Sequence, residues 1–192
     1  MSSRKMTRII LFLTLFPLLF SPLMASGSEI AVSGPEARVV NSELLVTTGL
    51  ALDEKNLADL KKGLAKEITF YVDLFRVWKT WPDEFITGKK LVKTLWSDPI
   101  KKEYIATSFD GATLIEKRFR NFDSMLNWTL NLKDLKLINT RELQQSDYFV
   151  KVTVISRLRS LPPVIGYLLF FVPEREFKVL KDSAVLTVGS EK

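Results

Sequence analysis

The sequence contains no cysteine and no histidine among its 192 residues. The absence of cysteine excludes disulfides, thiolate metal sites, thiol nucleophiles and a lipoprotein anchor. The absence of histidine removes the commonest general base and the commonest ligand of transition metals. Any enzymatic chemistry would therefore have to use carboxylates, lysines, tyrosines or hydroxyls.

Sequence motifs for known chemistry are absent as well: there is no phosphate-binding glycine loop, nucleophile elbow, calcium loop or zinc spacing. Asp83 and Glu84 adjoin in a turn, where a turn-and-cap role is the common one for such carboxylates. Asp73 lies within a strand pattern, where a charge is costly unless that face contacts water or the charge is paired. A half-exposed sheet face is the plain interpretation, and Arg76 and Arg157 are the candidates for a partner. An enzyme built on these carboxylates ranks third among our hypotheses, and we predict no enzyme, catalytic residue, cofactor or metal.

Residues 1–27 have the composition of a secretory signal peptide. Three basic residues in the first eight positions precede an apolar run, 9–24, and then a group of small residues. We expect cleavage after Ala25 or Gly27, export, and a periplasmic location with possible membrane association. The alternative is an uncleaved anchor, although the apolar run is shorter than the roughly 20 residues that span a bilayer.

The formal net charge of the chain is +6, but it is unevenly distributed. The expected signal peptide holds three basic residues and no acidic one, so the remainder carries +3. Its lysine pairs are scattered along the sequence, which is typical of a solvated surface and not of a nucleic-acid-binding stripe. We therefore expect no nucleic acid as a partner; the sequence does not indicate the oligomeric state.

The remainder is long enough for a single domain, expected over residues 37–188 after a flexible lead-in, 28–36. Two extended runs separated by Asn41 and Ser42 predict a β-hairpin at its start. Asp53 is suited to cap a short helix, whose apolar stripe is expected at Leu57, Leu60 and Leu64.

The stretch 64–81 carries the clearest strand signal. It begins as the tail of the helix, and from Ile68 its apolar and polar residues alternate, which predicts the central strand of a half-buried sheet. A second alternating run begins at Tyr148 and is expected to lie beside it. The inward residues are expected to be Ile68, Phe70, Val72 and Leu74 in the first run, and Tyr148, Val150, Val152 and Val154 in the second.

Other segments complete the predicted fold. The run 89–96 fits a helix or a strand, and we favour a strand; Asp110 and Gly111 predict a two-residue hairpin turn. A second helix is expected to begin at Asn121 or Asp123, and a last edge strand within 177–188, whereas 135–143 gives no clear pattern. The fold class is therefore α+β: mainly antiparallel β-sheet, sandwich-like, with two short amphipathic helices packed on it.

Aromatic residues provide the remaining functional clue. An apolar run, 164–172, lies between prolines, and it either packs beneath the sheet or forms an exposed patch. Our first hypothesis is a non-enzymatic module that contacts an envelope protein or the membrane surface; the alternative is a binder of a lipid or other apolar ligand in an aromatic-lined cavity. The expected interaction surface comprises Arg76, Trp78, Trp81, Asp83, Tyr167, Phe170 and Phe171.

The order of several short motifs resembles the uncharacterised bacterial envelope family DUF4390. A helix ending in Gly63 is followed by the alternating strand, a basic and tryptophan-containing end at Arg76 and Trp78, and then Trp81 with Asp83. The similarity continues to about Ser183 through Tyr104, Phe119, the segment 122–126, the strand 148–158 and the Leu161-Pro162-Pro163 sequence. The resemblance implies a bacterial source, an exported or membrane-associated location and an unassigned role.

Overall fold

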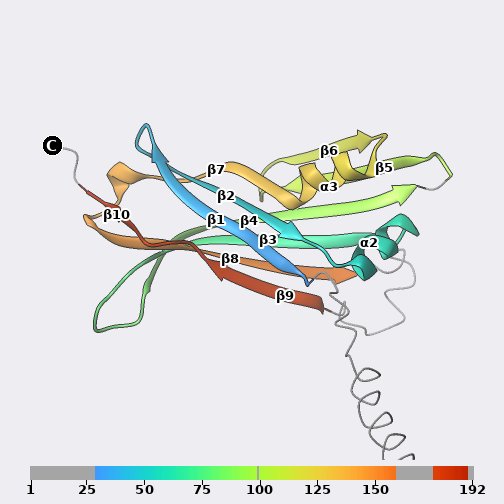
Figure 1. Ribbon diagram of the computed structural model, residues 1–192. Helices are drawn as coiled ribbons and strands as arrows, with labels where there is room; N and C mark the ends of the chain where they lie inside the picture. The colour runs from blue at the N-terminus through green and yellow to red at the C-terminus, as the bar shows by residue number, and fades with distance from the viewer. Residues whose placement is uncertain (1–28, 99, 159–174, 190–192) are drawn as a thin grey trace, which may run out of the picture.

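The computed structural model describes residues 29–98, 100–158 and 175–189, which form two facing antiparallel sheets with two short helices beside them (Figure 1). Two sheets that are each apolar on one face bury that apolar surface by packing the two faces together. The expected α+β class, mainly antiparallel with two helices, is confirmed.

The larger sheet has the strand order β10-β8-β3-β4-β5-β6, and β9 also pairs with β8. β3 lies between β8 and β4, and its four alternating apolar residues are fully buried, so the predicted central strand is confirmed. The predicted neighbour beginning at Tyr148 is also confirmed as β8. The strands are β3 (Lys66–Arg76), β4 (Glu84–Asp98), β5 (Glu103–Phe109), β6 (Leu114–Phe119), β8 (Ser146–Leu158), β9 (Arg175–Asp182) and β10 (Leu186–Val188).

The smaller sheet has the order β1-β2-β7, with β1 (Ala31–Val40), β2 (Glu43–Ala51) and β7 (Asn131–Asn139). Asn41 and Ser42 both have positive φ, as a tight turn between twisted antiparallel strands requires, and the predicted hairpin is confirmed. β1 begins six residues earlier than expected, so the last six of the nine residues of the expected flexible lead-in, 28–36, belong to a paired strand. β7 occupies most of the stretch that showed no clear pattern.

Two helices and one 3-10 turn, η2 (Thr140–Glu142), complete the described fold. Asp53 caps α2 (Glu54–Lys61) by accepting from the Asn56 amide, and Asn121 caps α3 (Phe122–Leu130) by accepting from two amides. The expected leucine stripe is only partly right. Leu60 is fully buried and Leu57 is partly buried, whereas Leu64 follows the end of α2 and is 48% exposed.

The hairpin between β5 and β6 is present, but its connection has four residues, 110–113, where two were expected. The Asp110 carboxylate accepts from the amides of Ala112 and Thr113, and Gly111 has a φ of +100°. The side-chain bonds stabilise the wider turn, and the two amide bonds lower the pKa of Asp110. The predicted last edge strand is divided between β9 and β10, which pair with different parts of β8.

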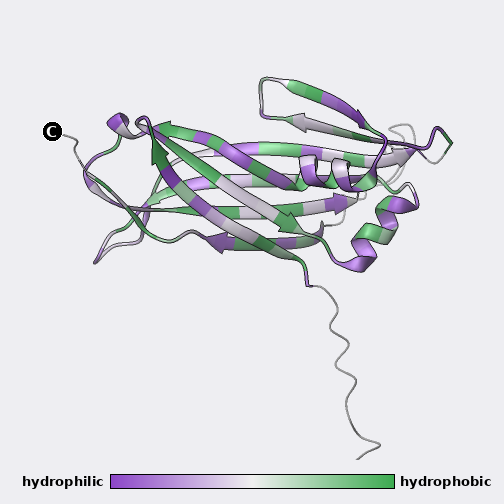
Figure 2. Cartoon of the chain, turned by 45° about the horizontal axis from the view of Figure 1, so that its top comes forward, coloured by the Kyte–Doolittle hydropathy of each residue, from purple (hydrophilic) through white to green (hydrophobic). Residues whose placement is uncertain are grey.

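The hydrophobic core lies between the two sheets. Figure 2 shows hydrophilic and hydrophobic residues alternating along the strands, so that one face of each sheet is apolar. The smaller sheet contacts the larger one through β1 with β8 and β9 and through β7 with β4, whereas α3 contacts β4, β5 and β6. No helix of the described residues is long and apolar enough to span a membrane.

Candidate functional site

The connection between β3 and β4 extends beyond the end of the sheet (Figure 1). We call residues 76–85 the tryptophan loop; they include the last residue of β3 and the first two of β4. The amide of Val77 donates to the carbonyl of Asp147 over 2.8 Å, which extends the contact between this hairpin and β8 by one bond. The loop therefore leaves the sheet from a well-anchored base.

Arg76 is the centre of the contacts at that base. Its Nε donates to Oε2 of Glu84 over 3.0 Å, its Nη2 bonds the same oxygen, and its Nη1 donates to the side-chain oxygen of Gln144 over 2.5 Å. The guanidinium also lies over the Trp78 ring, 4.6 Å from its centroid. The bonds from Arg76, followed by that from Trp78, hold the pKa of Glu84 below its ordinary value.

Trp78 is held by both acidic residues of the loop. Its amide donates to Oδ1 of Asp83 and its indole Nε1 donates to Oε2 of Glu84, each over 3.2 Å. The paired carboxylates therefore have the turn-stabilising contacts that are common for such residues. Despite these bonds Trp78 is 45% exposed, and its neighbours Trp81 and Phe85 are 75% and 56% exposed.

An aromatic cluster continues from the loop onto the outer face of the larger sheet. The Phe75 ring stacks on Phe149 with centroids 5.4 Å apart and meets Phe85 edge-on at 5.8 Å. The ammonium of Lys151 lies 4.9 Å from the Phe75 centroid. The exposed Phe85 is therefore continuous with a packed aromatic surface.

The structure brings four of the seven predicted surface residues onto this one loop: Arg76, Trp78, Trp81 and Asp83. Tyr167, Phe170 and Phe171 lie outside the described residues. The described ends that flank them, Leu158 and Arg175, are at the far end of β8 from Tyr148, which pairs with Arg76.

Asp73 has a different neighbour from the two arginines that the sequence suggested. It pairs across the strands with Lys151 and Gly88, while Arg76 bonds Glu84 and Arg157 pairs with Glu67 in the sheet register. A Cβ on Gly88 would lie 2.2 Å from the Asp73 carboxylate, so the glycine makes room for it. Partial burial raises the pKa of Asp73, and the nearby Lys151 opposes that rise.

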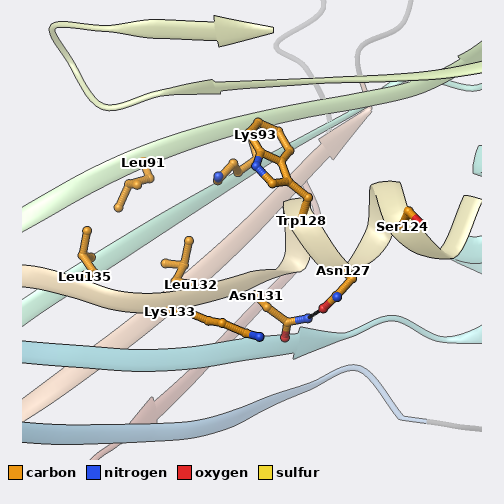
Figure 3. Close-up of a pocket in the computed structure, with 9 residues that line it drawn as sticks. All are labelled: Leu91, Lys93, Ser124, Asn127, Trp128, Asn131, Leu132, Lys133 and Leu135. Carbon is orange, nitrogen blue, oxygen red and sulfur yellow. Dashed lines mark hydrogen bonds between the residues drawn. The ribbon is translucent and has the colours of Figure 1, made fainter. Parts of the chain in front are cut away.

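A groove of about 500 Å³ between β4, β7 and α3 was not predicted as a site. Figure 3 shows Leu91 and Lys93 of β4 facing Leu132 and Leu135 of β7, with the Trp128 ring of α3 beside Lys93. Lys93 is 6% exposed and its Nζ is 4.5 Å from the Trp128 ring centroid. One feature of the sequence points to the groove: Lys93 falls in phase with Leu91 and Leu95, which places a lysine on the apolar face of β4.

Within the described ranges no three acidic residues come together in a group that could hold a metal ion. Comparison with curated proteins and with solved structures found no match. Comparison with protein families found one match, which covers residues 27–183 and so includes both sheets, the tryptophan loop and the groove. The chain therefore belongs to the family described as "Domain of unknown function (DUF4390)".

Proposed function

We propose that the protein is an exported, non-enzymatic module of the bacterial envelope that binds a protein partner through the tryptophan loop. The export signal supports the location: a basic start, an apolar run and small residues at the expected cleavage site. The lack of histidine and cysteine supports a binding role, as do the contacts that tie Asp83 and Glu84 to the loop itself.

The observation that carries this proposal is the exposure of three large aromatic side chains on one braced loop. Trp81, Phe85 and Trp78 face water at its surface, while Arg76, Glu84 and Asp83 fix its backbone and the Trp78 ring. Tryptophan and arginine are enriched among residues that dominate binding energy at protein interfaces. A loop already held in shape loses less conformational entropy when a partner binds.

Charge favours a protein partner over a lipid surface. The tryptophan loop contains two basic residues, Arg76 and Lys79, and two acidic residues, Asp83 and Glu84, so its formal net charge is zero. Attachment to anionic bilayers usually combines interfacial aromatics with an excess of basic residues. The loop has the aromatics but lacks that excess.

Site-specific crosslinking in intact cells tests the proposal. A photoreactive p-benzoylphenylalanine is placed at Thr80, which is exposed between the two loop tryptophans, and a control is placed at Leu114, which is exposed on another hairpin. We expect a protein adduct of one mass from position 80 and none of that mass from position 114. Mass spectrometry then identifies the adduct.

The Trp81→Ala variant makes the result specific to the loop. Because Trp81 is the most exposed of the three aromatics, its removal should abolish the position-80 adduct and leave the thermal unfolding midpoint within about 2 °C. Equal adducts with and without Trp81 would contradict the proposal. Trp81-dependent flotation of the purified protein with liposomes would instead assign the loop to the membrane.

A further inference from the structure

The groove between β4, β7 and α3 has the size and lining of a ligand site. Its volume of about 500 Å³ is within the roughly 300–1,000 Å³ typical of small-molecule pockets. Leu91, Leu132 and Leu135 supply its apolar walls, and Trp128 lies beside Lys93 between these leucines and the polar part of the lining (Figure 3). It opens to solvent beside the exposed residues Ser124, Asn127, Asn131 and Lys133, and it is separate from the tryptophan loop.

Lys93 places a cation in this apolar setting. Its side chain extends from β4 towards the groove and contacts the Trp128 ring, and a second lysine, Lys117, lies 5.2 Å from the same ring centroid. Among the described residues no carboxylate lies within 4 Å of either ammonium group. One aromatic ring therefore faces two positive charges that have no acidic counterpart beside them.

Lys66, a second buried lysine on the same face of the sheet, has acidic partners that compensate its charge. Lys66 is fully buried, and its Nζ lies 2.6 Å from Oε1 of Glu176 and 3.8 Å from Oδ2 of Asp59. Lys93 is nearly as buried, and no carboxylate of residues 29–98, 100–158 and 175–189 forms an ion pair with it. Burial, with a smaller effect of Lys117, lowers the pKa of Lys93. A bound anion would give Lys93 the counter-charge that Glu176 gives Lys66.

We propose that this groove binds an anionic amphiphile, with its carboxylate or phosphate head at Lys93 and its hydrocarbon chain along Leu91, Leu132 and Leu135. Lys93 complements the head by charge and lies against the Trp128 ring, and Lys117, near the same ring, adds to the positive charge around the head. The leucines favour a hydrocarbon chain over a fully polar anion, because its transfer removes apolar surface from water on both sides.

Calorimetric titration of the full mature chain with simple probes tests this proposal. The probes are dodecanoate, dodecyl phosphate, dodecanol and inorganic phosphate, each used below the concentration at which it forms micelles. We expect one molecule of dodecanoate or dodecyl phosphate to bind at least tenfold more tightly than dodecanol or inorganic phosphate. The tighter of the two anionic probes identifies the preferred head group.

Two variants on the same strand distinguish binding in the groove from non-specific attraction of the anionic probe to a lysine. Lys93→Met should weaken binding of the better anionic probe at least tenfold, whereas Lys90→Met should leave it unchanged. Lys90 is the matched control because it lies on the opposite face of β4 and also faces an aromatic ring, that of Tyr71. Lys117→Met, an exposed change, gives a second test and should weaken binding several-fold.

Three results would overturn the proposal: equal affinity for dodecanol and dodecanoate, equal affinity for phosphate with and without its dodecyl chain, or an equal loss in the Lys90 and Lys93 variants. Circular dichroism of each variant confirms that the fold is retained. The Trp81→Ala variant should bind the probe as the unmodified chain does, so this test is independent of the tryptophan loop.

Discussion

At the scale of one residue, Lys93 lowers the stability of the free protein and at the same time provides the positive charge for the proposed ligand site. An ammonium group that leaves water without a partner incurs a desolvation cost, and the face of Trp128 offsets only part of it. Lys66 meets the same apolar surroundings with Glu176 beside it, so its charge is compensated. Substitution by methionine should therefore raise the free energy of unfolding at Lys93 and lower it at Lys66.

Replacing Lys93 by methionine should stabilise the free protein by about 1 kcal/mol, because the variant keeps most of the side-chain volume and removes the uncompensated charge. Burial lowers the pKa of Lys93, so the unfolded chain binds more protons than the folded chain between that lowered value and the ordinary one of 10.5. The stability of the unmodified protein should therefore rise with pH across this window.

Urea denaturation of both proteins between pH 7 and pH 10.5 checks this expectation. The advantage of Lys93→Met should be largest at pH 7 and should disappear as the pH approaches 10.5. A variant that is less stable than the unmodified protein at pH 7 would show that Lys93 has a stabilising partner.

At the scale of elements, the sequence predicted the features that depend on residues within a single strand or helix. The alternation in β3 and β8 gave their inward faces, and the capping residues gave the starts of α2 and α3. β7 gave no such signal. Its neighbour on one side is β2, and only part of its face is covered by β4. Its burial therefore follows from distant contacts that no local pattern encodes.

The candidate sites divide in the same way. Arg76, Trp78, Trp81 and Asp83 are close in sequence, so one hairpin brings them together and sequence proximity was sufficient to group them. The groove combines β4 with α3 and β7, which are brought together only by the packing of the two sheets. The phase of Lys93 with Leu91 and Leu95 follows from the strand alone, but the ring beside it comes from Trp128, 35 positions later.

Helix α2 offers a matched pair of leucines for testing its contact with the sheet. Leu60 is fully buried and its carbonyl accepts a bond from the Ser97 hydroxyl of β4, whereas Leu64 is half-exposed beyond the helix end. We expect Leu60→Ala to lower the free energy of unfolding by about 2–5 kcal/mol and Leu64→Ala by less than about 0.5 kcal/mol. Chemical denaturation measures both, and equal losses would contradict this position of α2.

Across the whole molecule, the two sheets differ in width, and the groove follows from that difference. The smaller sheet covers the larger one from β8 and β9 to β4, and beyond that line α3 takes over the cover of β4, β5 and β6. The groove lies where β7 gives way to α3. A wider second sheet would have covered this part of β4 with a further strand.

The Lys66 and Glu176 pair joins parts of the chain that are 110 residues apart and connects β3 to β9. The Ser156 hydroxyl donates to the second oxygen of Glu176, so both carboxylate oxygens are bonded. Removing one member of a buried pair leaves the other charge uncompensated. Lys66→Met should therefore lower the free energy of unfolding by about 3–5 kcal/mol, opposite in sign to Lys93→Met.

A double substitution separates the charge from the packing. In Lys66→Met with Glu176→Gln neither charge remains, and the glutamine keeps an oxygen for the Ser156 hydroxyl. We expect this variant to regain at least half of the stability that Lys66→Met loses in urea denaturation. If the double variant is no more stable than Lys66→Met alone, the loss comes from packing around the lysine stem or from the Asp59 carboxylate left without Lys66, and compensation by Glu176 does not explain the contrast between the two buried lysines.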